Sequence, residues 1–267
     1  MNARLVLLAS LAGILATGAC SSSPSTGTAG AASTGTPAKA VQTPSDPRDL
    51  LLKSLPSAET GSVRFAATGG TKVTGIQDTV KHVMQVDLTE KDPDFTLTMH
   101  LLYVEKKAWV KISLSGAAGL PSIPKKWMLI DPSKIKKGDD ALPTAYADDN
   151  DPAEVGTILQ AAAGVRQTSP GHFAGTTDIS NTSDGDVTDA KTLAALGTSA
   201  KAVPFEATTD AQGRLRSVLV KIPKTAKTKA STYGVTYRDY GTAAVPHVPS
   251  GSEQQKATPV VYQMLNG

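Results

Sequence analysis

Residues 76–112 read IQDTVKHVMQVDLTEKDPDFTLTMHLLYVEKKAWVKI, and apolar and polar side chains alternate along most of this stretch. Alternation with a period of two is typical of strands that bury one face. The pattern predicts one long strand over 76–88, a second over 95–101 and a third over 109–112. Short charged segments separate them and supply turns. This stretch therefore predicts a meander of consecutive antiparallel strands.

The flanking sequence adds three short helices. Asp46-Pro47 and Asp151-Pro152 each place a capping residue before a proline, which is typical of a helix start. The first of these helices is expected to end near Leu55. The second carries an apolar stripe that ends at Gly164, and a third, capped by Asp186 or Thr188, is expected to end at Gly197.

Further strands complete an α+β domain over residues 46–249. They are predicted over residues 63–67, 126–131, 172–179, 203–207, 214–222 and 232–240. Residues 250–267 are expected to form a tail or a short strand around 259–262. No internal repeat is present.

The N-terminus has the form of a signal peptide. Arg4 provides the positive charge, residues 5–16 form an uncharged apolar run, and Thr17-Gly18-Ala19 precede the single cysteine, Cys20. The run is shorter than the roughly 20 residues of a membrane-spanning helix. Small residues directly before a cysteine resemble a bacterial lipobox. This resemblance implies removal of residues 1–19 and lipidation of Cys20, with acylation of its new amino group. An ordinary signal peptide with an incidental cysteine is the alternative.

The segment after Cys20 is expected to be a flexible linker. Residues 21–45 read SSSPSTGTAGAASTGTPAKAVQTPS, with Val41 as the only large apolar residue. A flexible coil of this length has a root-mean-square span of about 25–30 Å. The linker would therefore let the following domain stand away from a membrane.

Composition excludes several classes of protein. The formal net charge of the 267 residues is +3, and basic residues alternate with acidic ones along most of the chain, which does not favour nucleic-acid binding. With one cysteine there is no internal disulfide. Aromatic residues are only 4% of the chain, so a binding surface would consist mainly of aliphatic side chains.

No enzyme or cofactor motif is convincing. Ser122 and Lys125 match a Ser-x-x-Lys spacing, but they lie among prolines and have no Lys-Thr-Gly partner. The four histidines lack metal-ligand spacing. The acidic segment at Asp184 and Asp186 lacks the ligand series of a calcium loop. We therefore expect no catalytic residues, no metal and no cofactor.

The remaining feature is a sheet with one apolar face. Ten residues are predicted to line it, among them methionines whose flexible side chains suit irregular ligands. They are Val63, Phe65, Val80, Met84, Val86, Phe95, Leu97, Met99, Val110 and Ile112. The helices that begin near Asp151 and Asp186 either cover this face completely, which gives a dry core, or leave a cavity for acyl chains.

Several phrases resemble the LolA-like carriers, specifically the actinobacterial LppX and LprG lipoproteins. They include Ser62-Val63-Arg64-Phe65, the long hairpin, residues 126–131, residues 203–206 followed by 210–215, and the closing residues 235–241, which read VTYRDYG. The resemblance runs from about residue 50 to residue 249 and carries no catalytic motif. It implies an open, curved antiparallel half-barrel with short helices across its concave face, around a hydrophobic cavity.

The resemblance also implies a function. Its members carry lipids or lipoproteins across the cell envelope, so we expect a lipoprotein on the extracytoplasmic face of the cell membrane that binds acyl chains. Its partners would be a lipid, the membrane that holds its N-terminal anchor, and an envelope transport protein. The alternative is an envelope interaction or sensing lipoprotein with a closed core and no small-molecule ligand.

Overall fold

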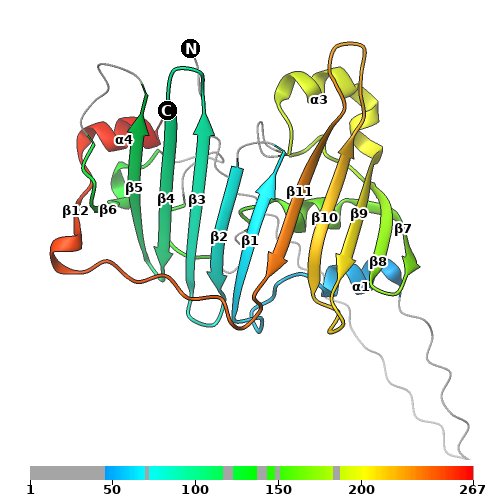
Figure 1. The fold of residues 1–267 in the computed structure, drawn as a ribbon, viewed down its shortest axis with the longest axis horizontal. Coiled ribbons are helices and arrows are strands. Elements are labelled where there is room, and N and C mark those ends of the chain that lie inside the picture. Colours follow the sequence, from blue (N-terminus) through cyan, green and yellow to red (C-terminus); the bar gives the residue numbers. More distant parts are fainter. Residues whose placement is uncertain are drawn as a thin grey trace, which may run out of the picture.

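The computed structural model describes residues 46–69, 72–116, 123–136, 143–147, 151–182 and 187–266. Cys20, the linker over residues 21–45, Ser122 and the acidic pair Asp184 and Asp186 lie outside these ranges. In the described part of the chain, twelve strands form one sheet in the order β12-β6-β5-β4-β3-β2-β1-β11-β10-β9-β8-β7 (Figure 1). All neighbouring strands are antiparallel except β12 and β6, which are parallel. The predicted α+β class and antiparallel meander are therefore confirmed.

The strands vary from three to nine residues in length. They are β1 (Ser62–Thr68), β2 (Lys72–Asp78), β3 (Val83–Lys91), β4 (Thr96–Val104), β5 (Lys107–Ser115), β6 (Trp127–Leu129), β7 (Ala162–Ser169), β8 (His172–Thr177), β9 (Val203–Thr209), β10 (Leu215–Ile222), β11 (Ser231–Arg238) and β12 (Gln254–Lys256).

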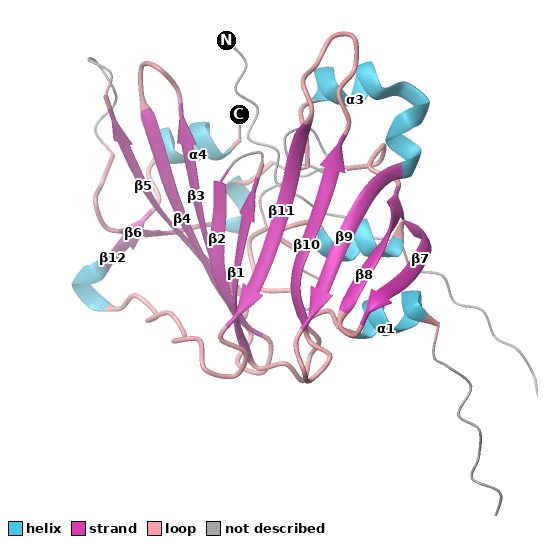
Figure 2. Ribbon diagram, turned by 45° about the vertical axis from the view of Figure 1, so that its right-hand side comes forward, coloured by secondary structure: helices cyan, strands magenta, loops and turns pink. Residues whose placement is uncertain are grey.

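The described helices are all short. The α-helices are α1 (Pro47–Lys53), α2 (Val155–Gln160), α3 (Ala190–Leu196) and α4 (Pro259–Leu265), and the 3₁₀ helices are η1 (Pro132–Lys134), η2 (Gly197–Ala202) and η3 (Gly251–Glu253). Figure 2 shows them around the sheet. Within the described ranges, no helix has the length and apolarity to cross a membrane.

Side-chain caps explain where the helices begin. The carboxylate of Asp46 accepts a hydrogen bond from the Arg48 amide, as the prediction of a helix at this point requires. The third helix is capped by Asp189 and not by Asp186 or Thr188, because the Asp189 carboxylate accepts from the Thr192 amide.

The predicted long strand over 76–88 is wrong. Its residues form the end of β2, a tight turn over 79–82 and the first half of β3, and the two strands pair in an antiparallel hairpin. The carboxylate of Asp78 accepts hydrogen bonds from the amides of Val80 and Lys81, and His82 has a φ of 52°. An Asp that accepts amides two and three residues ahead stabilises a turn against an extended chain.

Two other segments differ from the expectation. Ala162–Ser169 forms strand β7, whereas the sequence pattern predicts that the preceding helix continues to Gly164. Residues 259–262 lie in helix α4 and not in a strand, while β12 forms just before them. Pro259 occupies the first turn of α4, where its missing amide hydrogen costs nothing.

One hydrophobic cluster joins the sheet to the helices. It contains alternate residues of most strands together with Leu51 of α1, Ile158 and Leu159 of α2, and Val261 of α4. These helices therefore pack against the same core as the sheet. A second, smaller cluster consists of Val83, Leu102 and Trp109, with Val245 packed against it.

The chain between β11 and β12 follows the lower end of the sheet as it is drawn in Figure 1. It supplies Val245 to the smaller cluster. Gln254, at the start of β12, accepts a hydrogen bond of 2.6 Å from the indole nitrogen of Trp109. The C-terminal segment is thus attached to the half of the sheet formed by the β-meander.

Candidate functional site

Seven of the ten residues predicted to line an acyl-chain site are buried on one face of the sheet. None of the seven is more than 3% exposed, and all belong to the main cluster. They are Val63 and Phe65 of β1, Met84 and Val86 of β3, Met99 of β4, and Val110 and Ile112 of β5. We call this face the interior face.

The strand register explains why these residues share a face. Phe65 lies opposite Gly75, which lies opposite Val86, and the row continues through Leu101 to Val110. Directly paired residues on neighbouring strands project to the same side of a sheet. The alternation in the sequence therefore identified the interior face correctly in β1, β3, β4 and β5.

The other three predicted residues lie elsewhere or are less buried. Val80 is 65% exposed, because it lies in the turn between β2 and β3 and not in a strand. Phe95 lies in the turn before β4, where its carbonyl accepts a hydrogen bond from the Asp92 amide, and it is half-buried. Leu97 is half-buried and packs against the main cluster. Val80 therefore lies outside the candidate site.

Two phenylalanine rings lie over glycines on the interior face. A Cβ atom at Gly75 would lie 2.3 Å from Cζ of Phe65, and one at Gly175 would lie 3.0 Å from Cε1 of Phe205. Each ring therefore occupies the space that a side chain on the neighbouring strand would take. The alternation in the sequence does not predict these pairs, because a glycine has no side chain and so does not contribute to an apolar pattern.

Tyr103 of β4 places a polar atom in this apolar region. The residue is 1% exposed, and its hydroxyl has no hydrogen-bond partner among the described residues. Burial raises the pKa of Tyr103 well above its ordinary value, so the hydroxyl is neutral. An unpartnered buried hydroxyl costs about 1–3 kcal/mol. Its position continues the series of Met99 and Leu101, so the same alternation could have identified it.

A second polar group lies at the start of α2. The carboxylate of Asp151 accepts hydrogen bonds from the amides of Val155 and Gly156 at 3.0 and 2.6 Å. Desolvation raises the pKa of Asp151 above its ordinary value, although these amide hydrogen bonds oppose the shift. Burial, and then the charge of Asp151, raises the pKa of Tyr237 on β11. The nearby Tyr233 hydroxyl donates to the Ala153 carbonyl at 2.7 Å. These contacts fix α2 against the sheet.

The seven buried residues of the interior face are shielded from solvent by the described part of the protein. Two hollows stand out in the described part of the protein, and none of the ten predicted residues lines either of them. One, of about 730 Å³, lies between η1 and α4 and is open to solvent. The other, of about 440 Å³, is formed by the loop between β10 and β11.

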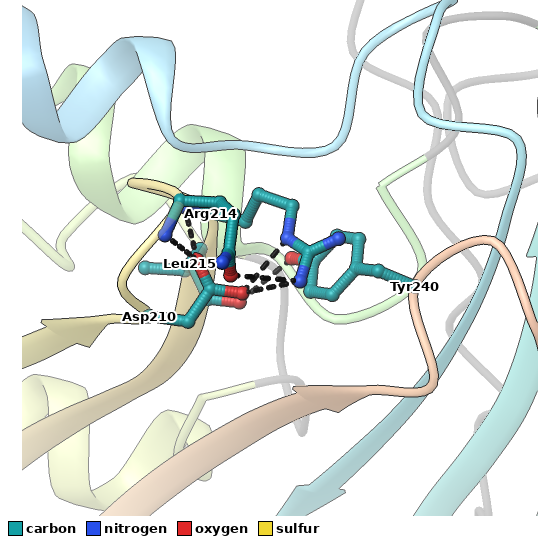
Figure 3. Close-up of polar contacts among 5 residues, drawn as sticks. Asp210, Arg214, Leu215 and Tyr240 are labelled. Atoms are coloured by element: carbon teal, nitrogen blue, oxygen red, sulfur yellow. Dashed lines mark hydrogen bonds and ion pairs between the residues drawn. The ribbon is translucent and has the colours of Figure 1, made fainter.

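Two of the phrases that carry the family resemblance meet in space. Figure 3 shows the guanidinium of Arg214 between the Asp210 carboxylate and the Tyr240 ring. A guanidinium nitrogen lies 2.8 Å from a carboxylate oxygen of Asp210, and the guanidinium carbon lies 4.8 Å from the centre of the Tyr240 ring. The Tyr240 hydroxyl donates to the Leu215 carbonyl at 2.7 Å. Burial raises the pKa of Tyr240, and the charge of Asp210 adds to this effect.

Asp210 itself is stabilised as a carboxylate. Its partial burial works to raise its pKa, but hydrogen bonds from the backbone and side chain of Arg214 outweigh this effect and hold the pKa below its ordinary value. The cluster joins the β9–β10 turn to the end of β11. These contacts therefore connect two segments that lie about 25 residues apart in the sequence.

The four histidines have different surroundings and form no common site. His82 stacks on Tyr146, and His172 is exposed at the start of β8. His100 lies 2.6 Å from Asp87, and His247 lies 3.0 Å from Glu253. Among the residues that the structure describes, no group of three His, Cys, Asp or Glu side chains is placed to hold a metal ion.

Comparison with known proteins gives no relative: no protein-family model matches the chain, and no curated protein matches it significantly.

Proposed function

We propose that this protein is an extracytoplasmic lipoprotein, anchored through lipidated Cys20, that binds acyl chains at the interior face and carries or presents lipids within the cell envelope. In this proposal the sheet is a half-barrel and the short helices lie across its concave side. The observation that carries the proposal is the buried Tyr103 hydroxyl, which has no hydrogen-bond partner among the described residues and lies in a mostly apolar part of the interior face. An ester carbonyl of a bound lipid would accept its hydrogen bond.

The packing of the interior face defines how a lipid would enter. Since the interior residues are buried in one cluster with residues of α1, α2 and α4, an acyl chain would have to displace part of a helix. The helices α1, α2 and α4 have only six or seven residues each, and helices this short derive their stability from packing. Each methylene buried in the space they vacate would contribute about 0.8 kcal/mol to binding.

A second candidate function is an envelope interaction or sensing lipoprotein with a closed core. The close packing favours it, because Val63 and Val110 are 0% exposed and the hollows in the described part of the chain lie away from them. In this case the outer surface would make the functional contacts.

Lipid extraction distinguishes these functions. The full chain is purified from its native envelope, weighed by native mass spectrometry and extracted with organic solvent. A lipid carrier retains lipid beyond the covalent anchor, and Val86→Trp, which fills space that an acyl chain would occupy, reduces the amount retained. A closed core yields no extractable lipid from either chain. In both cases Val86→Trp costs about 1–3 kcal/mol through overpacking, so the extracted lipid and not the stability decides between the two functions. Arg216→Trp, an exposed position beside the interior residue Leu215, controls for effects of tryptophan itself.

A further inference from the structure

The β10–β11 hairpin holds a large excess of positive charge. Residues 214–238 contain seven basic residues and no acidic one. Because the formal net charge of the whole chain is +3, the remaining residues together carry a charge of −4. Charge is thus distributed very unevenly over a protein that is nearly neutral overall.

Two of these seven basic residues form ion pairs with described carboxylates, and neither of the two lies in the loop over residues 223–230. Arg214 pairs with Asp210, and Lys221 pairs with Glu206 on the neighbouring strand. Lys224, Lys227 and Lys229 are exposed, and none of the three forms an ion pair with a described residue. The loop therefore carries three ammonium groups within a span of six residues, 224–229.

The tip is an ordered loop. The Thr225 amide donates to the Thr228 carbonyl at 2.9 Å, and the amides of Lys227 and Thr228 donate to the Thr225 hydroxyl. Residues 224–230 surround the open hollow of about 440 Å³. Figures 1 and 2 both show this hairpin extending past the neighbouring strands at one end of the sheet. The lysines are therefore held together at a projecting end of the protein.

The composition of the tip indicates the class of partner. Its other residues are Pro223, Thr225, Ala226, Thr228 and Ala230. Protein interfaces depend on large anchors such as Trp, Tyr and Arg, and single-stranded nucleic acids need aromatic stacking. The tip offers neither. A lipid surface requires only clustered ammonium groups near anionic head groups.

We propose that residues 223–230 dock this protein on the surface of an anionic phospholipid bilayer. The docking is electrostatic, and it is independent of acyl-chain binding at the interior face. Each lysine close to an anionic surface strengthens binding by a factor of about five, so three lysines supply a factor on the order of 100 at low salt. Salt screens this attraction.

Vesicle binding tests the proposal. The experiment uses the chain from Ser21 to Gly267, which contains every described residue and lacks Cys20. Vesicles contain phosphatidylcholine alone or with about 30% phosphatidylglycerol, a content that gives a negative surface potential. We expect binding to the anionic vesicles only, a loss of most of this binding in about 0.5 M NaCl, and a loss of roughly 100-fold in the Lys224→Gln, Lys227→Gln, Lys229→Gln triple variant.

Matched variants make the test specific. Lys106→Gln, Lys125→Gln and Lys126→Gln remove three exposed charges elsewhere and should leave binding nearly unchanged. Arginine at positions 224, 227 and 229 should restore binding, because it restores the charge. Equal loss in both glutamine triples, equal binding to neutral vesicles, or no vesicle binding overturns the proposal. Equally tight binding to soluble poly-aspartate also overturns it, since the partner would then be an acidic protein.

Discussion

At the residue scale, the hydroxyl groups of two buried tyrosines differ in their partners. The Tyr103 hydroxyl has none among the described residues, whereas the Tyr233 hydroxyl donates to the Ala153 carbonyl at 2.7 Å. Replacing a tyrosine by phenylalanine removes only the oxygen. The two substitutions therefore separate a costly hydroxyl from a stabilising one.

We expect Tyr103→Phe to raise the free energy of unfolding of the lipid-free chain by about 1 kcal/mol, because it removes an unsatisfied donor. Tyr233→Phe should lower it by about the same amount, since the Ala153 carbonyl loses its partner. Urea denaturation measures both. If a lipid carbonyl accepts from Tyr103, Tyr103→Phe also reduces the lipid that copurifies. A loss of stability in Tyr103→Phe equal to that in Tyr233→Phe would contradict the assignment.

Asp210 provides a test of charge within the Asp210–Arg214–Tyr240 cluster. Its folded-state pKa lies below the ordinary value of 3.8, so its ionised form stabilises the fold above that pH. This contribution is lost as the pH falls from 3.8 towards the folded-state pKa. Asp210→Asn keeps an oxygen for the turn amides but removes the charge.

The Asp210→Asn substitution should lower the free energy of unfolding by about 1 kcal/mol at neutral pH. The loss is small because the Arg214 side chain is half-exposed, and solvent weakens its ion pair. The difference from the unmodified protein should shrink as the pH falls below 3.8 towards the folded-state pKa, because the carboxylate of the latter then protonates. Urea denaturation at neutral pH and in this acidic range tests this. Asp94→Asn, at an exposed carboxylate without a hydrogen-bond partner in the described part of the chain, should show neither effect. A difference that persists unchanged in acid would show that charge is not the cause.

At the scale of elements, the sequence predicted strands more reliably than their ends. The alternation in 95–101 and 109–112 identified β4 and β5, because each strand buries one face. It merged β2 with β3, since Val80 keeps the apolar period through a turn that the Asp78 side chain stabilises. Helix α4 was missed because Val260 and Val261 favour a strand, while their packing against the core favours a helix.

The alternation of apolar and polar residues could predict neither strand β7 nor the contacts between phenylalanine rings and glycines. The pairing of β7 with β8 is interrupted by register shifts, so its residues do not alternate regularly. Gly75 lies directly beneath the Phe65 ring, and this packing depends on the register of two strands. The register in which two strands pair depends on the folded structure and cannot be derived from the alternation within one strand.

Gly75→Ala tests this close packing. The new Cβ would lie 2.3 Å from Cζ of Phe65 and 2.3 Å from the carbonyl oxygen of Gln85, and the latter is backbone that pairs β2 with β3. We expect a loss of about 1–3 kcal/mol in the free energy of unfolding. Gly234→Ala, where the nearest atom is a threonine hydroxyl at 3.3 Å, should cost much less. Equal costs measured by urea denaturation would show that the ring does not restrict position 75.

At the scale of the whole molecule, two proposed membrane contacts differ in their physical nature. The hairpin lysines would bind through charge, which salt screens within about 10 Å at 0.1 M. A lipidated Cys20 would bind through buried acyl chains, which salt does not weaken. Together they would attach the protein at its N-terminus and at the projecting hairpin, with the domain lying between the two contacts.

Cys20→Ala separates these contacts in cells. Because a diacylglycerol group provides two acyl chains and two lipid signals give stable anchoring, the unmodified protein should stay with membranes after a wash in about 1 M NaCl. The Cys20→Ala variant should leave the membrane fraction under that wash, and any part that remains at low salt should disappear when Lys224, Lys227 and Lys229 are also replaced by Gln. Ser21→Ala, which alters the next residue and keeps the thiol, is the control. Fractionation followed by immunoblotting measures each outcome, and salt-resistant membrane association of Cys20→Ala would show that the thiol does not carry the anchor.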